Sequence, residues 1–271
     1  MGAGAGTRGG TVGTAEFWSG WWWPAMTAVL GFAFTWLVFR QWLSRRKPHQ
    51  LAWSVGLLMY AVAALMEAVS ELSGVWDPTV YRIYIVLAAS MVGYLGLGSY
   101  YLLAKTKTGP HIYLGMLLGW ELVFVWGVMN TVLIAEKLVP GITVGGQALG
   151  SAGSFPRIMS LPFNISGTTF LLGGALISIY RFARKREFAY RMWANVLIAL
   201  GTICIAAAGS MARAGVSAGL YPAEMVASAI LLAGFLMAGT LDKGVKESVA
   251  AGRERRAREA AAAAAPAAPA E

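Results

Sequence analysis

An acidic side chain stands inside a long apolar stretch of this 271-residue sequence. Glu121 lies within residues 112–135, where most of its neighbours are Leu, Val, Trp and Met. A charged group in the apolar layer of a membrane costs roughly 3 kcal/mol or more unless it is paired or wetted, so its presence needs a reason. Two interpretations stay open: Glu121 binds a proton or a cation, or it is a neutral acid held by a structural hydrogen bond.

Six further charged residues fall near the ends of neighbouring apolar stretches. They are Glu67, Glu71, Arg82, Arg157, Arg213 and Glu224. Glu67 and Glu71 are four residues apart, so they share one face of a helix. The threading derived below places all six in the outer half of the membrane, and we expect three acids and three arginines to form one outer charged cluster. The cluster either joins the helix ends through ion pairs or recognises a polar solute.

Asn130 and Asn164 are further intramembrane polar candidates. Asn164 follows Pro162, and a proline removes one backbone hydrogen bond and kinks helices, which frees a carbonyl group. Either amide side chain has the chemistry to bond such a carbonyl group or a ligand. Broken helices beside polar side chains recur in transporters, although a proline in the first turn of a helix is tolerated in any case.

The residues needed for most catalytic and cofactor chemistry are missing. Cys204 is the one cysteine, and the two histidines, His49 and His111, fall at helix ends, where they cannot pair inside a bundle to hold a haem. Zinc-ligand spacings and the Gly-x-Ser-x-Gly motif of hydrolases are absent. We therefore expect no metal, no cofactor and no catalytic residue. The remaining enzymatic interpretation is a carboxyl group such as Glu121 acting on lipid.

Seven apolar stretches are long enough to cross a bilayer, which takes about 20 residues in a helix. They span residues 22–42, 51–73, 80–104, 112–135, 158–180, 192–212 and 221–241. The hydrophobic fraction of 57%, the charged fraction of 13% and the mean hydropathy of +0.59 argue against a soluble enzyme, a disordered chain and a nucleic-acid reader. Because backbone groups in hydrocarbon must bond within their own segment, we expect an all-α bundle of seven transmembrane helices.

Basic residues predict how the chain is threaded. Most of the 22 lysines and arginines fall in four segments on one side of the membrane, residues 40–47, 105–107, 181–191 and 243–258. The positive-inside rule then places the N-terminus outside and the C-terminus in the cytoplasm of a multi-pass protein of the cell membrane.

The domain organisation follows from this threading. Residues 1–16, rich in Gly, Ala and Thr, are predicted to be disordered, residues 17–242 to form the transmembrane domain, and residues 243–271 to form a basic, then Ala/Pro-rich cytoplasmic tail. The outer loop, residues 136–157, is rich in Gly and Pro and longer than a plain connector. It is a lid over an outer cavity, a partner contact or a slack linker.

Small residues predict where the helices pack closely. Gly115 and Gly119 form a G-x-x-x-G motif in one stretch, and Gly93, Gly96 and Gly98 fall in the stretch before it. These patterns favour intimate packing and name no activity.

Seven helices with an outer N-terminus match the layout of rhodopsins and seven-helix receptors. A retinal protein needs a lysine in the middle of its last helix, whereas the first lysine here is Lys243, at the end of that helix, which argues against retinal. The same layout occurs in sugar carriers built from two three-helix repeats, but residues 22–104 and 158–241 show no convincing repeat.

One segment carries a resemblance. It contains Trp76-Asp77-Pro78, then Tyr81-Arg82-Ile83-Tyr84, then the run Gly-Tyr-Leu-Gly-Leu-Gly-Ser-Tyr-Tyr-Leu-Leu at residues 93–103. The segment resembles part of uncharacterised bacterial seven-helix integral membrane proteins. The likeness covers a single helix and its approach, and it implies no activity and no functional residue.

The function expected from these features is non-catalytic: a sensor-like protein or an accessory subunit of a membrane complex. No output domain follows the last helix, so a sensor of this kind passes its signal to a separate chain. The alternative is a small-solute or ion transporter with an intramembrane carboxylate. Expected partners are the lipid bilayer and a membrane protein or a second copy of the chain, but no nucleic acid, because the basic residues are spread over four segments beside membrane ends.

Overall fold

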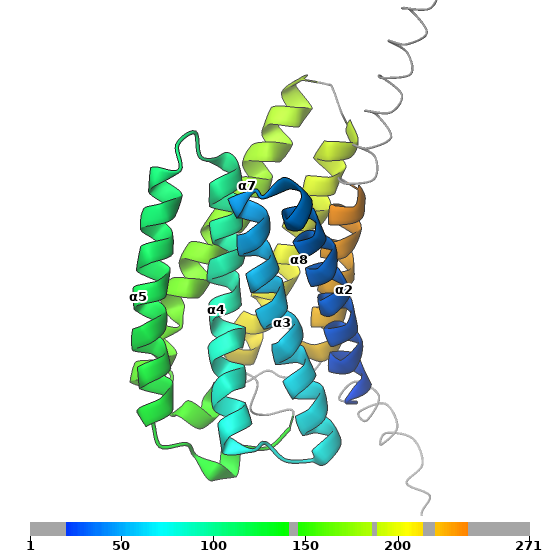
Figure 1. The fold of residues 1–271 in the computed structure, drawn as a ribbon. Helices are drawn as coiled ribbons and strands as arrows, with labels where there is room; N and C mark the ends of the chain where they lie inside the picture. Colours follow the sequence, from blue (N-terminus) through cyan, green and yellow to red (C-terminus); the bar gives the residue numbers. More distant parts are fainter. Residues whose placement is uncertain (1–19, 141–145, 186–188, 214–219, 238–271) are drawn as a thin grey trace, which may run out of the picture.

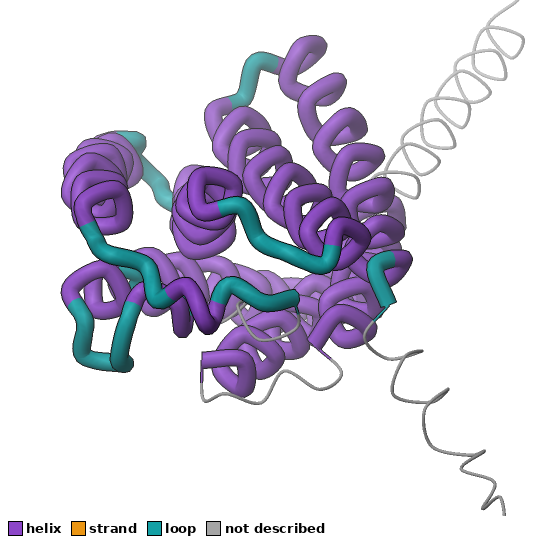
Figure 2. The backbone as a smooth tube through the Cα atoms, turned by 90° about the horizontal axis from the view of Figure 1, so that it is seen from below, coloured by secondary structure: helices purple, strands orange, loops and turns teal. Residues whose placement is uncertain are grey.

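The computed structural model describes residues 20–140, 146–185, 189–213 and 220–237. In these ranges the chain forms helices and no strand (Figure 2). The long helices are α2 (Trp22–Arg45), α3 (Pro48–Ser73), α4 (Pro78–Leu103), α5 (Thr108–Asn130), α7 (Leu161–Lys185), α8 (Ala189–Arg213) and Leu220–Met237, here named the last helix. Between α5 and α7 lie η1 (Ala135–Lys137), η3 (Gln147–Leu149) and α6 (Phe155–Met159). The predicted segment 1–16 and tail 243–271 lie outside the described residues.

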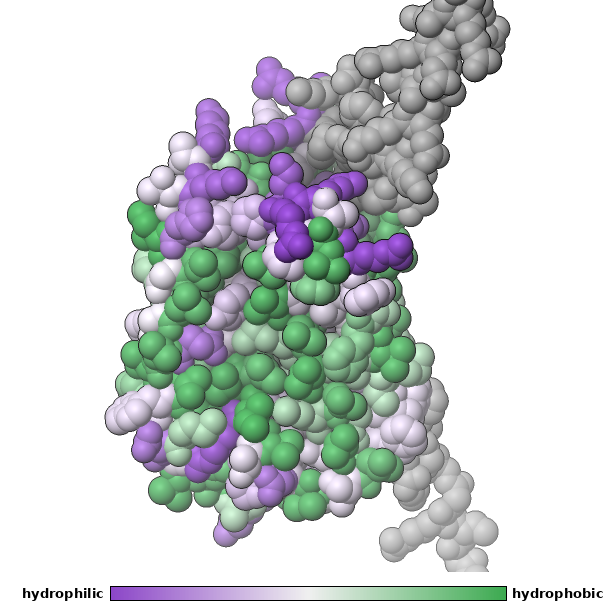
Figure 3. Space-filling model, viewed as in Figure 1, coloured by the Kyte–Doolittle hydropathy of each residue, from purple (hydrophilic) through white to green (hydrophobic). Residues whose placement is uncertain are grey.

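The described residues hold seven helices that are long and apolar enough to cross a membrane, α6 and α7 counting together as one span. Figure 3 shows apolar residues over the middle of one face and hydrophilic residues gathered toward its ends. Large apolar side chains on this surface are open to the surroundings, for example Leu122 at 73% and Val29 at 69% exposure. On seven helices of membrane-spanning length, such an apolar surface indicates contact with lipid. The prediction of an all-α, multi-pass membrane protein with seven spans is confirmed.

Most of the long helices form a closed ring. In chain order α2 packs on α3, α3 on α4, α4 on α7 and α7 on α8. The last helix completes the ring, since the rings of Phe34 in α2 and Phe235 lie 5.0 Å apart and Gly201 in α8 faces Leu231. Helix α5 stands outside the ring against α4, at the edge of the view in Figure 1.

The two ends of the bundle differ in character. The basic end carries the turn after α2, with Arg46 and Lys47, and the segment after α4, with Lys105 and Lys107; it is the upper end in Figure 1. The loop end, opposite, carries residues 74–77 and the connection between α5 and α7.

Local sequence sets the turn between α3 and α4. Helix α3 ends at Gly74, whose φ of 72° is a left-handed conformation that glycine adopts without strain. Asp77 then caps α4, because its carboxylate accepts the backbone N–H groups of Thr79 at 2.8 Å and Val80 at 3.0 Å. Pro78 occupies the first turn, where its missing donor costs little.

The tightest contact between helices joins α4 and α7 at two glycines. A Cβ atom added to Gly96 would lie 2.6 Å from the Cα atom of Gly167, and one added to Gly167 would overlap the carbonyl oxygen of Val92. Gly96 is one of the small residues noted in the sequence, and it allows the two helices to approach closely. The G-x-x-x-G motif of α5 makes no such contact, because a Cβ atom on Gly115 or Gly119 would meet no described atom within 4 Å.

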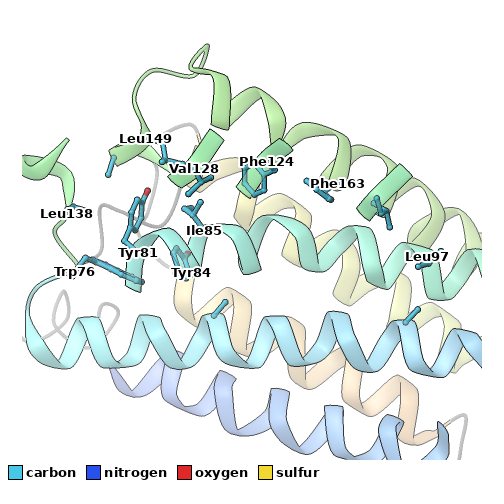
Figure 4. Packing of buried hydrophobic residues seen from close by; sticks show 14 residues of the cluster. Trp76, Tyr81, Tyr84, Ile85, Leu97, Phe124, Val128, Leu138, Leu149 and Phe163 are labelled. Atoms are coloured by element: carbon cyan, nitrogen blue, oxygen red, sulfur yellow. The ribbon is translucent and has the colours of Figure 1, made fainter. Parts of the chain in front are cut away.

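An aromatic cluster fills the core at the loop end. Trp76 packs against Tyr81 and Tyr84, with ring centroids 5.7 Å and 4.8 Å away, and all three rings are buried (Figure 4). Phe124 and Phe163 extend the cluster from α5 and α7. This core fixes the approach to α4 against the rest of the bundle.

The described parts of the loop predicted at 136–157 pack on this core. The backbone N–H of Ile134 donates to the carbonyl of Ala148 at 2.9 Å, and that of Trp76 donates to Leu138 at 3.4 Å. Ala148 is fully buried. These parts therefore form ordered structure, and a slack linker does not describe them.

Two predicted spans have different ends in the structure. Helix α5 ends at Asn130 and not at residue 135, because Arg82 donates to the carbonyl groups of Val128 and Thr131 and so occupies acceptors at the helix end. The span predicted at 158–180 contains a break at Ser160, which separates α6 from α7.

Candidate functional site

A cavity of about 1010 Å³ lies inside the bundle. Residues of all seven spans contribute to its wall, together with the loop residues Gly146, Leu149 and Ala152. Much of the wall is apolar, and its small residues include Ala63 and Ala64 of α3 and Ala88 and Ala89 of α4. Small side chains on these helices leave space between them.

The volume is enough for a small organic molecule. Ligand sites of proteins typically have volumes of about 300–1,000 Å³. The wall runs along α4 from Tyr84 to Leu95 and along α3 from Leu57 to Glu67. At 1.5 Å per residue both stretches are roughly 15 Å long, so the cavity is elongated along the helices.

Glu67 places a carboxyl group on the wall near the loop end. The residue is 3% exposed, and its Oε1 atom accepts the hydroxyl of Tyr84 at 2.6 Å. That bond is the one hydrogen bond of the Glu67 side chain within the described residues. Its second oxygen therefore has no protein donor in this part of the chain.

Glu224 places a second carboxyl group on the same wall, from the last helix. Its backbone carbonyl accepts the hydroxyl groups of Ser228 at 2.6 Å and Tyr60 at 3.3 Å. The Tyr60 and Ser228 hydroxyl groups are also 2.5 Å from each other, which joins α3 to the last helix. No described group donates a hydrogen bond to the carboxylate of Glu224 itself.

Glu71 is placed differently from the other two acids of the predicted cluster. The hydroxyl of Tyr221 in the last helix donates to its Oε1 atom at 2.5 Å. Glu71 does not line the cavity. This bond ties the end of α3 to the start of the last helix.

The three arginines of the predicted cluster do not share one position. Arg82 is directed to the end of α5, as described above. Arg157 lines the cavity at the loop end and donates to the carbonyl of Gly150 at 3.2 Å. The side chain of Arg213 lies outside the description. The structure thus brings Glu67, Glu224 and Arg157 to one cavity and separates Arg82 from them.

Glu121 lies outside the cavity wall, near the middle of α5 where it faces α4. The hydroxyl of Ser90 donates to its Oε1 atom at 2.8 Å. Its Oε2 atom is buried and has no hydrogen-bond partner among the described residues. The bond joins α5 to α4, as the structural interpretation of the residue expects, while the unpartnered Oε2 atom is also consistent with a proton or cation site.

The two asparagines serve the backbone. Asn130 is exposed and donates to the carbonyl of Trp126 at 2.8 Å within its own helix. Asn164 donates to the carbonyl of Ser160 at 2.9 Å, beside the break that Pro162 accompanies, and it also lines the cavity. Of the two, only Asn164 is in reach of a bound molecule.

Three wall residues were missed in the sequence: Tyr60, Tyr84 and Ser228. Each is a hydroxyl side chain inside an apolar stretch, and each joins an acid-bearing helix to a neighbour. One of them could have been found from the sequence by its spacing from a glutamate, since Ser228 follows Glu224 by one helical turn.

The donor set on the wall suits hydrogen bonding and charge recognition. In the described ranges no three His, Cys, Asp or Glu side chains gather closely enough to hold a metal ion. Comparisons of the chain with protein-family models, with curated proteins and with solved structures give no significant match. The chain is a seven-span membrane protein whose distinguishing feature is a cavity with two carboxyl groups on its wall.

Proposed function

We propose that this chain is a non-catalytic, sensor-like protein of the cell membrane that binds a small, largely apolar molecule in the cavity between its helices. The observation that carries the proposal is the cavity of about 1010 Å³, which is elongated and polar at one end. A packed bundle normally contains few voids larger than a water molecule, so a space of this size calls for an occupant.

The wall supports binding better than catalysis. Its polar groups are carboxyl, hydroxyl, amide and guanidinium groups, and neither His49 nor His111 is among its residues. A bound molecule would contact the ring helices α3, α4 and α7 together with the last helix. Occupancy is therefore able to change how these helices pack, which is the kind of response that a sensor or an accessory subunit passes to a partner.

The orientation of the chain in the membrane is part of the same proposal. With the N-terminus outside and the C-terminus in the cytoplasm, the loop end and the acids of the cavity face the outer side. A sensor in this orientation receives its ligand from outside or from the outer leaflet. Reporters fused to each terminus test the threading, and a terminus found on the opposite side would refute it.

A matched pair of substitutions in α4 tests ligand binding. Ala88→Phe puts a large ring into the cavity, whereas Ile83→Phe puts the same ring on the exposed surface of the same helix. Native mass spectrometry of protein released from mild detergent should detect a co-purified small molecule on the wild type and on Ile83→Phe, and lose it on Ala88→Phe. Equal occupancy in all three proteins would contradict the proposal.

The role as an accessory subunit has its own test. A protein that works beside a partner complex should co-purify with that partner after mild solubilisation. A chain that runs alone under these conditions, while still holding its ligand, would favour an independent sensor.

Transport is the second candidate, because a cavity inside the membrane also suits a carrier. Its carboxylates would be Glu67 and Glu224, since Glu121 does not line the cavity. A carrier moves its solute across liposome membranes, and that flux should fail in Glu67→Gln and persist in Glu121→Gln. Binding without flux would exclude the carrier and leave the sensor.

A further inference from the structure

The Glu67 side chain is buried and the Glu224 residue is half-buried, and both carboxyl groups have fewer hydrogen-bond partners within the described residues than such groups normally have. Within the described residues Glu67 accepts one hydrogen bond, and the side chain of Glu224 accepts none. Neither forms an ion pair in the part of the chain that the structure describes. Buried polar groups are nearly always satisfied, and leaving one unpaired costs about 1–3 kcal/mol. Two such groups on the wall of one cavity point to a partner that the described residues do not supply.

The charged residues of the wall lie at one end of the cavity. Glu67, Tyr84, Glu224 and Ser228 lie toward the loop end, near the beginning or the end of their helices. Further along α4 toward the basic end the wall residues are Met91, Val92 and Leu95. The cavity therefore offers acceptors and negative charge at one end and an apolar channel at the other.

The geometry points to an amphipathic organic amine as the ligand of this cavity, with its cationic nitrogen between the Glu67 and Glu224 carboxylates and its apolar body along Met91, Val92 and Leu95. This inference rests on the proposed function, because it names the class of molecule that the cavity binds. A metal ion fits the site poorly, since the acids do not gather as a ligand set within the described residues. An ammonium group supplies up to three donors, which matches oxygens that have few donors of their own. The Tyr60 and Tyr84 rings on the same wall add aromatic surface of the kind that favours cations.

Among the described wall residues, Arg157 is the one feature of this end of the cavity that favours an anionic ligand. It lines the same end of the cavity and would attract a carboxylate group of a ligand. Its NH1 group already donates to the Gly150 carbonyl at 3.2 Å, and two carboxyl groups line the same cavity. The balance of charge at this end favours a cation, and the experiment below includes the anion as a direct competitor.

Three probes with one apolar body separate these interpretations: 4-phenylbutylamine, 4-phenylbutan-1-ol and 4-phenylbutyrate. Binding to the full-length protein in lipid nanodiscs is measured as the concentration that gives half of the maximal rise in the unfolding temperature. We expect the amine to bind at least 10-fold more tightly than the alcohol, and the carboxylate to bind most weakly. Glu67→Gln together with Glu224→Gln should abolish this preference, while Glu121→Gln, an intramembrane glutamate outside the wall, should keep it.

The outcomes distinguish this inference from the proposed function. If amine and alcohol bind equally, or the carboxylate binds best, the amine inference is overturned and the cavity remains a ligand site. If none of the three probes binds and Ala88→Phe also leaves the co-purified molecule unchanged, the proposed function fails as well. A double variant that does not fold is replaced by each single Glu→Gln variant, in which the preference should fall but persist; an unchanged preference in both would overturn the inference.

Discussion

Two kinds of glutamate lie within the membrane-spanning helices of this protein, and their surroundings differ. Glu121 sits between α5 and α4, where Ser90 donates to one oxygen and the other is buried without a partner among the described residues. Glu67 and Glu224 stand on the wall of a cavity of about 1010 Å³. The first carboxyl group has one oxygen bonded to Ser90 and one buried oxygen, whereas the other two lie on the wall of a space that a molecule can occupy.

This difference shows that depth in the membrane does not predict which carboxyl groups line the cavity. Near the middle of α5, Glu121 has the location expected of an ion site, yet its contacts are those of a structural hydrogen bond. Glu67 and Glu224 lie closer to helix ends, where a charge costs less, and they have the open geometry of a binding site. What an intramembrane acid does depends on whether it faces a helix or a cavity.

The largest expected effect comes from the glycine that holds α4 against α7, since α4 carries both Ser90 and Tyr84 and so supports both kinds of site. Gly167→Ala places a Cβ atom into the carbonyl oxygen of Val92, a backbone atom that cannot turn aside. We expect the free energy of unfolding in detergent to fall by about 3 kcal/mol or more.

Gly173→Ala is the matched control for that crossing. A Cβ atom there meets no described atom within 4 Å, and alanine favours a helix over glycine by about 1 kcal/mol. Equal stability of the two variants would show that α4 and α7 do not cross at Gly167, and both sites would then need a different arrangement.

A smaller loss of stability is expected when Glu67 loses the tyrosine hydroxyl that donates to it. Ligand binding should not change in the same variant. Tyr84→Phe removes the donor to Glu67 and should lower the free energy of unfolding by about 2 kcal/mol, because a buried acceptor loses its bond. The preference for 4-phenylbutylamine should persist, since both Glu67 oxygens then become available to the ligand. Tyr101→Phe, whose hydroxyl forms no hydrogen bond in the described ranges, should change stability by less than about 0.5 kcal/mol. If Tyr84→Phe loses the preference for 4-phenylbutylamine, the Tyr84 hydroxyl itself belongs to the binding site.

The smallest effect is expected at Glu121. Glu121→Gln keeps an acceptor for the Ser90 hydroxyl, so we expect the free energy of unfolding to change by no more than about 1 kcal/mol and ligand binding to stay as in the wild type. Thermal unfolding with and without 4-phenylbutylamine measures both. A strong loss of binding in this variant would erase the contrast between the two kinds of glutamate.

The sequence was a good guide to the spans and a poor one to the contacts between them. Length and apolarity locate seven helices in the sequence, and the structure adds that Gly74, Asp77 and Pro78 set the turn between α3 and α4 through features that act within a few residues. The early end of α5 was not predictable, because it depends on Arg82 of another helix.

The cavity could not be predicted because it is an absence of side-chain volume. Small residues such as Ala63 and Ala88 suggest close packing in a sequence, and the same residues leave space where facing helices stay apart. The charged cluster was likewise an inference from position along the membrane. Position alone could not tell that Glu71 meets Tyr221 while Arg82 turns to α5.

The contrast among the glutamates is tested most directly by reacting the native protein in nanodiscs with N,N′-dicyclohexylcarbodiimide, a small apolar reagent that adds to carboxylic acids and leaves a stable N-acylurea. Peptide mass spectrometry then reports the modified fraction at each position in one sample. The structure leads us to expect modification at Glu67 and Glu224, reduced by 4-phenylbutylamine, with Glu121 modified at least 10-fold more slowly because one of its oxygens is buried and the other accepts the Ser90 hydroxyl. Modification of Glu121 at the same rate as the other two, or protection of none by the amine, would contradict the account.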